Sequence, residues 1–372
     1  MKGLKKNKKA VVAMSGGIDS SVAAALLKKT DFNIIGVFMR FWMASEKNGL
    51  IGTWDRCCSL EAENRARKVA QILNIPFYVF NFEKEFKRKV VNYFLDGYKN
   101  GITPNPCVVC NKEIKFGLLL KKALILGTDF VATGHYARLK NYYLKKNPGG
   151  EKVKWKLFRA KDKEKDQSYF LWKLNQKQLK HILFPIGNYT RDEVRALAKK
   201  FKLSFLLDIP KSMEICFIPN ADLAGFLKTQ IRSDKGKIIS IDGQIVGEHE
   251  GLHFYTIGQR KGIGFSKGPY FVLDKDLKNN SLIVTKNKED LYKKELIAKN
   301  VNWISGKKPK LPLIVKSEIR YHQLPVVTKV IDDKKSKVYR LKFKSAQRAV
   351  TPGQSVVFYK NNEVLGGGII SS

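Results

Sequence analysis

The amino-acid sequence predicts an α/β protein in which a doubly wound, mainly parallel sheet is followed by two smaller β-rich domains. A chain of 372 residues with 44% hydrophobic residues is too long for one ordinary core. In its first half, short apolar runs alternate with helix patterns, as they do in parallel sheets. After about residue 210, short alternating runs separated by Gly, Asn and Asp turns take over. We therefore expect three domains, at 1–210, 211–290 and 291–372.

Apolar periodicity and end signals place the individual elements. Thr190 and Glu193 form a capping box that starts a helix, and Gly127 stands where a helix C-cap belongs. Strands are expected at 10–14, 34–39, 76–82 and 129–133, and helices at 20–29, 59–73, 84–98 and 110–127. The β-rich runs lie at 237–249, 270–286, 337–345 and 354–370.

Charge and cysteine usage narrow the class of protein. The formal net charge is +37, from 70 Lys and Arg against 33 Asp and Glu, and it indicates a polyanionic partner such as nucleic acid. The alternative is that the excess of lysine reflects the composition of the genome, in which case the basic surface is merely solvated. Five cysteines are an odd set, unlike a secreted disulfide framework. No apolar stretch is long enough for a membrane helix, and the basic start lacks a signal-type apolar core. We expect a cytoplasmic protein with no membrane partner.

The loop after the first strand, "AMSGGIDSS" (13–21), has the composition of a phosphate-binding loop. Gly16 and Gly17 allow close backbone approach, Ser15 offers a hydroxyl, and Asp19 is a ligand type that Mg²⁺ prefers. The loop lacks the lysine of a Walker motif. The same residues also make an ordinary helix start, so composition alone leaves both interpretations open.

Two resemblances refine this hypothesis. "SGGIDS" resembles the pyrophosphate loop of the N-type ATP pyrophosphatases, which adenylate a substrate oxygen and have an adenine nucleotide alpha-hydrolase-like fold. Further strings, in this order over nearly the whole chain, resemble the tRNA-specific 2-thiouridylase family: "TPNPCVVCNKEIKFG", "DFVATGHYAR", "KDQSYFLW", "EICFIPN", "YTIGQRKGIG", "IRYHQ" and "TPGQSVVFY".

The family resemblance implies ATP-dependent 2-thiolation of the wobble uridine in tRNAs for lysine, glutamate and glutamine. The uridine 2-oxygen is adenylated, and sulfur then arrives from a persulfide on Cys216, with Cys110 as the partner nucleophile. The persulfide attacks directly, or Cys110 first releases sulfide. Either route releases AMP and pyrophosphate and leaves a disulfide. A cysteine desulfurase or a relay protein is the expected persulfide donor.

The resemblance also implies the binding residues, with insertions of the first domain and the C-terminal barrel-like domain contacting tRNA. ATP, with Mg²⁺, is expected on Ala13, Met14, Ser15, Gly16, Gly17, Ile18, Asp19, Ser20, Met39 and Gly134. The tRNA and its target base are expected on Asn105, Pro106, Cys107, His135, Lys165, Asp166, Gln167, Arg320, Tyr321 and Gln354. Taken alone, Met39 has the pattern of a core methionine and Cys216 that of a buried, inert cysteine.

Cys107 departs from the family, in which many members have aspartate at this position. With Cys110 and Cys216 it would give three thiolates, the minimum for a [4Fe–4S] cluster with one open position, so this remains an alternative to the persulfide. A closed zinc site fits less well, because the sequence has one CxxC and no suitably spaced His pair. We expect Cys110 just before a helix, where a thiolate is favoured. Cys57 and Cys58 are interpreted as structural or incidental.

Two rival functions remain open from sequence. Another enzyme of the pyrophosphate-loop type would adenylate a carboxylate or carbonyl and add nitrogen, with no need for Cys110 or Cys216. A non-catalytic RNA-binding protein would hold a metal on its CxxC, and replacing Asp19 would leave it unaffected.

Overall fold

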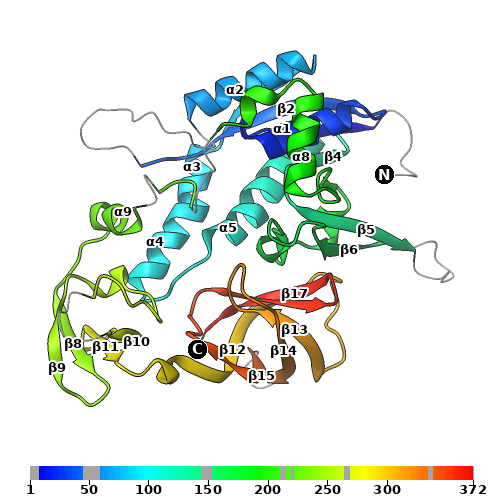
Figure 1. Ribbon diagram of the computed structural model, residues 1–372. Coiled ribbons are helices and arrows are strands. Elements are labelled where there is room, and N and C mark those ends of the chain that lie inside the picture. The colour runs from blue at the N-terminus through cyan, green and yellow to red at the C-terminus, as the bar shows by residue number, and fades with distance from the viewer. Residues whose placement is uncertain are drawn as a thin grey trace.

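A computed structural model describes residues 8–44, 59–143, 153–209, 215–218, 222–263, 269–333 and 338–371. Figure 1 shows an α/β part, which carries the N-terminal half, above two β-rich parts that follow it in the chain. The expected fold class is confirmed. Cys57 and Cys58 lie outside the described residues.

A five-stranded parallel sheet forms the centre of the α/β part. Its order is β3-β2-β1-β4-β7, with bounds β1 Lys9–Ala13, β2 Asn33–Arg40, β3 Phe77–Asn81, β4 Phe130–Thr133 and β7 Ile182–Leu183. The chain order reverses between β1 and β4, where Val11 pairs with Ile35 on one side and Val131 on the other. In open α/β sheets, ligands bind beyond the carboxyl ends of the strands at such a reversal.

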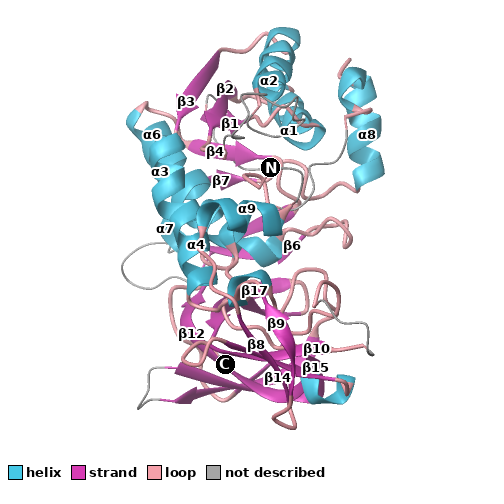
Figure 2. Ribbon diagram, turned by 90° about the vertical axis from the view of Figure 1, so that its left-hand side faces the viewer, coloured by secondary structure: helices cyan, strands magenta, loops and turns pink. Residues whose placement is uncertain are grey.

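Helices cover both faces of this sheet, so β1 is apolar and buried from Ala10 to Ala13, with only Lys9 at its start exposed. Val12 packs into the core under α1, α2 and α8, whereas Val11 packs into the core under the α3–α6 segment. Figure 2 shows these two helix layers on opposite sides of the sheet. The first layer comprises α1 Ile18–Lys28, α2 Leu60–Ile72 and α8 Arg191–Lys200. The capping box of Thr190 and Glu193 is present at the start of α8, as the sequence predicts.

The second layer consists of two long helical rods that contain π-helical stretches. The first joins α3 (Glu83–Phe86), a π-helical stretch (Lys87–Val91) and α4 (Asn92–Lys99). The other joins α5 (Pro106–Val109), a π-helical stretch (Cys110–Leu119) and α6 (Leu120–Ile125).

The position of Cys110 corrects the sequence-based expectation that it precedes a helix. The rod begins at Pro106, because Asn105 caps it by accepting a hydrogen bond from the Val108 amide. Proline at the first helical position costs no hydrogen bond there and has the required φ. Cys110 is therefore the fifth residue of the rod, and Cys107 is the one that lies in its first turn.

The β-rich parts are a four-stranded sheet and a closed barrel. The sheet has the order β10-β11-β8-β9, with bounds β8 Gly236–Ser240, β9 Ile245–His249, β10 Phe271–Asp276 and β11 Ser281–Thr285. In the barrel, β12 pairs with both β15 and β17, and its strands are β12 Tyr292–Trp303, β13 Leu313–Glu318, β14 Val326–Asp333, β15 Val338–Arg348, β16 Ser355–Lys360 and β17 Glu363–Ile370.

A hairpin from the α/β part extends the barrel sheet. Its strands are β5 (Ala137–Tyr143) and β6 (Val153–Arg159), and β6 pairs with β17. The remaining helices are short: α7 Gln176–Leu179, α9 Leu223–Gln230, and 3-10 turns at Ser168–Leu171, Ser204–Leu206, Leu252–Phe254 and Lys288–Leu291. The hairpin thus connects the α/β part to the barrel by backbone hydrogen bonds. Within the described ranges, no helix has the length and apolar character needed to cross a bilayer.

Candidate active site

One cavity of about 740 Å³ opens where the α/β part faces the barrel. It is lined at one point by the loop after β1 and by residues that follow β4, so it lies at the reversal of the sheet. Its wall contains most of the residues that the sequence predicts: Ser15, Gly17, Ile18, Asp19, Asn105, Pro106, Cys107, Cys110, His135, Lys165, Gln167, Cys216, Tyr321 and Gln354.

The loop after β1 is held in a shape that only glycine permits at one position. Gly16 has φ of +74°, and a Cβ there would lie 2.2 Å from the Ala62 carbonyl oxygen. The Ser20 hydroxyl accepts a hydrogen bond from the Ser15 amide at 3.1 Å and donates to the Gly17 carbonyl at 3.0 Å. The loop is thus fixed at the N-terminus of α1, a favourable place for a phosphate.

Asp19 contacts the segment that follows β4. The Tyr136 hydroxyl donates to its carboxylate at 2.9 Å, and a Cβ on Gly134 would lie 2.5 Å from the Ser20 amide nitrogen. Burial raises the pKa of Asp19, while Tyr136 and the nearby cation Lys165 act in the opposite direction. The carboxylate is therefore placed where a cation would compensate its burial.

Several cationic side chains in the cavity wall were not predicted from the sequence. They are Arg65 from α2, Lys115 from the second rod, and Arg191 and Arg195 from α8. The last two are four residues apart, which places them on one face of a helix just after a capping box. That spacing was the signal available in the sequence. Together with Lys165, these side chains suit a polyphosphate.

The three predicted sulfur residues lie in the wall of the same cavity. Cys107 and Cys110 come from the second rod, and Cys216 from the described segment 215–218. Phe217 anchors that segment, because its ring packs against two rings of the first rod. The ring centroid of Phe217 lies 5.8 Å from that of Phe86 and 5.3 Å from that of Phe94. Across the described ranges, no three His, Cys, Asp or Glu side chains are grouped so that they could hold a metal ion.

An aromatic cluster lies on the barrel side of the cavity. The Tyr321 ring packs against Phe170 and His322, with centroids 4.4 and 3.9 Å away. Burial raises the pKa of Tyr321 to about 12, so its phenol is uncharged at neutral pH. Gln354 lies nearby in the wall and donates to the Thr103 carbonyl at 2.9 Å, which links the barrel to the chain just before the cysteine rod.

His135 is an uncharged, fixed group in this wall. It is 8% exposed, and its Nδ1 lies 2.6 Å from the Thr133 hydroxyl. Burial lowers the pKa of His135 well below the usual value, with Lys115 adding to the effect. Any contact with tRNA is therefore that of a neutral imidazole.

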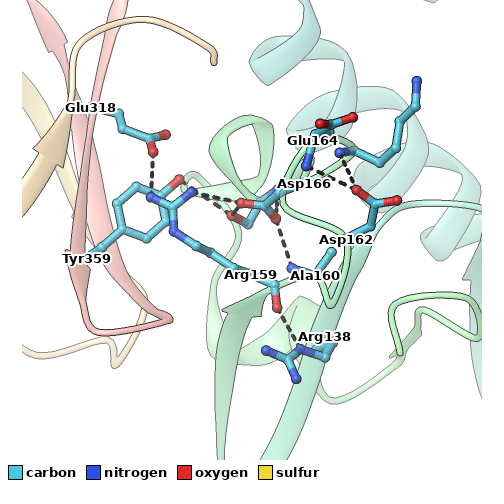
Figure 3. A network of polar contacts seen from close by, with 10 residues as sticks. Arg138, Arg159, Ala160, Asp162, Glu164, Asp166, Glu318 and Tyr359 are labelled. Atoms are coloured by element: carbon cyan, nitrogen blue, oxygen red, sulfur yellow. Dashed lines mark hydrogen bonds and ion pairs between the residues drawn. The ribbon is translucent and has the colours of Figure 1, made fainter. Parts of the chain in front are cut away.

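Two residues that the sequence predicts as tRNA contacts, Asp166 and Arg320, have hydrogen bonds in internal polar networks. Asp166 is 4% exposed and accepts hydrogen bonds from the Ala160 amide at 2.9 Å and from Arg159 at 3.0 Å. Arg159 also pairs with Glu318 of β13 at 2.5 Å and lies over the Tyr359 ring (Figure 3). Arg320 donates to the Ala349 carbonyl. These side chains connect the hairpin, the 160–168 loop and the barrel.

Other predicted residues support the site from outside the cavity wall. Ala13, Met14, Gly16, Ser20, Met39, Gly134, Asp166 and Arg320 do not line it. Met39 lies at the end of β2, where it packs against the core under α3–α6. Its predicted contact with ATP stays a prediction, as do the other residue roles.

Three family models match consecutive parts of the chain. Residues 8–220 match a tRNA methyl transferase HUP domain, 224–286 a tRNA methyl transferase PRC-barrel domain, and 293–370 an aminomethyltransferase beta-barrel domain. Fold and site together define an enzyme with a nucleotide-binding HUP domain and two appended β domains. The exact domain limits at 210 and 290 stay a prediction.

Full-length relatives specify the family. A tRNA-specific 2-thiouridylase of Thermoanaerobacter sp. strain X514 is 46% identical over 98% of both chains. That of Clostridioides difficile strain 630 is 45% identical over the same shares, and that of Caldanaerobacter subterraneus subsp. tengcongensis is 47% identical. The chain belongs to the tRNA-specific 2-thiouridylase family. The resemblance that the sequence motifs indicate is confirmed.

Proposed function

We propose that this chain performs the ATP-dependent 2-thiolation of the tRNA wobble uridine by sulfur transfer through Cys216 and Cys110. The activity follows from membership of the family, and the roles of individual residues are our assignment. The observation that supports them best is one cavity whose wall contains both cysteines and the loop after β1. The chemistry needs an activated oxygen and a sulfur carrier at one place.

ATP serves as the activating substrate, because the 2-oxygen of a pyrimidine is a poor leaving group. We assign its phosphates to the backbone of the loop from Ser15 to Ser20 and to three cations of the cavity wall, Arg65, Arg191 and Lys165. The loop fits a phosphate, because there is open space beside Gly17. A Cβ built on Gly17 would meet only the Ser15 hydroxyl, at 3.6 Å. Mg²⁺, held by Asp19 and the phosphates, would neutralise charge on the pyrophosphate that leaves.

The sulfur step balances without an external oxidant. The uridine 2-oxygen attacks the α-phosphate and releases pyrophosphate. The terminal sulfur of Cys216-S-SH attacks C2, AMP leaves with the oxygen, and the Cys110 thiolate attacks the bridging sulfur of the resulting adduct. The products are 2-thiouridine and a Cys110–Cys216 disulfide, which a thiol reductant reopens before a sulfurtransferase reloads Cys216. Release of sulfide by Cys110 before the attack gives the same products.

The barrel side of the cavity suits a base turned out of the anticodon loop. Tyr321 and Phe170 offer aromatic faces, and Asn105, Pro106 and Cys107 lie in the same wall. The excess of positive charge provides the long-range attraction that tRNA phosphates need. We expect this reaction to take place in the cytoplasm, where thiols are kept reduced.

A test separates the two sulfur mechanisms. The protein is purified without oxygen, its iron, sulfide and zinc are measured, and the same sample is assayed for 2-thiouridine with ATP, tRNA and a persulfide donor. We expect turnover by metal-free protein, loss of turnover in Cys110→Ser and in Cys216→Ser, and retained tRNA binding in both variants. A non-reducing peptide map after one turnover should show the Cys110–Cys216 disulfide.

One observation favours the [4Fe–4S] alternative, that Cys107 lies in the same wall as the other two cysteines, although the described side chains of these three residues are not grouped so that they could hold a metal ion. It requires activity that follows about four irons per chain and that is lost with Cys107. Such a result would refute the disulfide mechanism while leaving the thiolation activity intact. Absence of thiolation in every preparation would instead contradict the proposed function itself.

A further inference from the structure

The side chain that follows Cys110 has a buried acceptor atom without a partner. Asn111 is 3% exposed and lies in the cavity wall. Its Nδ2 donates to the Phe170 carbonyl at 3.4 Å, which directs the amide oxygen away from that carbonyl. No described donor reaches its Oδ1. Buried polar atoms are nearly always hydrogen-bonded in native proteins, so this oxygen indicates a donor that arrives with a ligand.

The other amide side chains of the cavity wall have hydrogen bonds inside the protein. Asn105 Oδ1 accepts from the Val108 amide at 3.3 Å, and Gln167 Oε1 accepts from the Tyr136 amide at 3.0 Å. Gln354 donates to the Thr103 carbonyl. Among these four wall amides, Asn111 is the one whose oxygen is both buried and without a partner.

We propose that Asn111 Oδ1 accepts a hydrogen bond from N3–H of the target uracil and thereby selects uridine over cytidine. This inference rests on the proposed function. N3–H is the donor on the pairing edge of uracil and lies between the 2- and 4-oxygens. Cytosine has a lone pair at the same position, which would face the amide oxygen. N3 is bonded to C2, the carbon that receives sulfur, and Asn111 is adjacent in sequence to the nucleophile Cys110.

The position of Phe170 supports the uracil assignment over one to adenine. Phe170 carries the carbonyl that fixes the Asn111 amide, and its ring packs against Tyr321 of the barrel. Asn111 is therefore tied to the aromatic cluster that we assign to the flipped base. The loop after β1 and its cations, which we assign to ATP, come from other elements of the wall.

The test compares uridine and cytidine at the wobble position, since both bases carry a 2-oxygen. The kcat/KM for 2-thiolation is measured on two tRNA transcripts that differ only in this base, with wild-type protein, Asn111→Leu and Gln323→Met. Gln323 is a matched control, because its Oε1 is also buried with no hydrogen-bond donor among the described residues, but it does not line the cavity. We expect Asn111→Leu to narrow the uridine-to-cytidine ratio by about 10- to 100-fold, and Gln323→Met to leave it unchanged.

A second measurement uses the wild-type protein and does not depend on how a variant folds. A tRNA with 3-methyluridine at the wobble position lacks the N3–H donor and should lose at least about 10-fold in kcat/KM. If 3-methyluridine reacts as well as uridine, the proposal is overturned. An unchanged uridine-to-cytidine ratio in folded Asn111→Leu also overturns it. If the KM for ATP is then raised, the Asn111 Oδ1 accepts from the adenine amino group of ATP. If all kinetic constants are unchanged, it accepts from a trapped water. Wild-type protein that thiolates no uridine would refute the proposed function instead.

Discussion

The Tyr136 hydroxyl donates a hydrogen bond to the Asp19 carboxylate at 2.9 Å, joining the segment after β4 to the loop after β1. These segments lie 117 residues apart in the chain. The contact joins the two segments at the point where the strand order of the sheet reverses, and it positions the carboxylate that we assign to Mg²⁺.

Asp19→Asn should make the nucleotide-free protein more stable at neutral pH while abolishing adenylation. Burial raises the pKa of Asp19 above its ordinary value of 3.8, so the ionised form is disfavoured in the folded state. A raised carboxyl pKa means that stability falls as pH rises from that ordinary value through the folded one. Asparagine avoids this cost and still accepts from Tyr136. Urea midpoints of both proteins, measured between pH 3 and 8, should converge at the acid end. A variant less stable than wild type at pH 8 would contradict the argument.

Gly16→Ala should destabilise the protein, whereas Gly17→Ala should be tolerated by the fold. The positive φ of Gly16 alone costs about 1–2 kcal/mol for a residue with a side chain, and the contact with the Ala62 carbonyl adds to it. Gly17 has an extended conformation, with φ of −95°. Denaturation curves measure this difference between two adjacent glycines, and equal stabilities would refute the assigned loop geometry.

Arg159→Met should unfold more readily at high pH than at low pH. Arg159 lies between the buried carboxylates of Asp166 and Glu318 (Figure 3). Removing one partner of a buried ion pair costs about 3–5 kcal/mol. Burial already raises the pKa of Glu318 above 4.5, and Arg159 opposes that rise. Without the guanidinium the pKa rises further, so stability should fall as pH increases from about 4.5.

Arg159→Lys is the matched control for this prediction. It keeps the positive charge but loses the planar fork that reaches two carboxylates, so an intermediate stability and a weaker pH dependence are expected. Stability of Arg159→Met that does not change between pH 5 and 8 would show that the two carboxylates have found other partners.

Cys107→Asp should fold normally and retain 2-thiolation. Position 107 is in the first turn of the cysteine rod, where a carboxylate is favoured by about 0.3–1 kcal/mol. Many family members carry aspartate there, and the persulfide mechanism uses only Cys110 and Cys216. Thermal midpoint and anaerobic turnover are measured on the variant beside Cys110→Ser. Loss of activity together with iron would favour the cluster alternative.

Tyr321→Leu should weaken productive tRNA binding more than Tyr321→Phe. Stacking of a base on an aromatic ring is worth about 1–3 kcal/mol, or roughly 5- to 150-fold in kcat/KM. Phenylalanine keeps the ring that packs against Phe170. KM for tRNA and KM for ATP are measured on both variants. If Tyr321→Leu and Tyr321→Phe lose the same factor in kcat/KM for tRNA, the phenol group and not the ring carries the effect.

The sequence by itself determined the fold class and the family, and it contained the residues to which we assign the chemistry. Local signals were sufficient for this: the apolar period of the strands, the glycines of the loop after β1, and the capping box at Thr190. It also contained Asn105 and Pro106, a cap followed by a first-turn proline, although the start of the cysteine rod was predicted four residues too late.

The tertiary structure decided which side chains face the cavity and which support it. Asp166 and Arg320 were predicted as tRNA contacts, yet their hydrogen bonds are internal, to partners on the β5–β6 hairpin and on the barrel. Arg65 lines the cavity although no local motif marked it, and Tyr136 and Arg191 line it although the sequence motifs assigned neither of them a role. Burial and pairing depend on contacts between residues far apart in the chain, such as Arg159 and Glu318, and local periodicity carries no information about those distances.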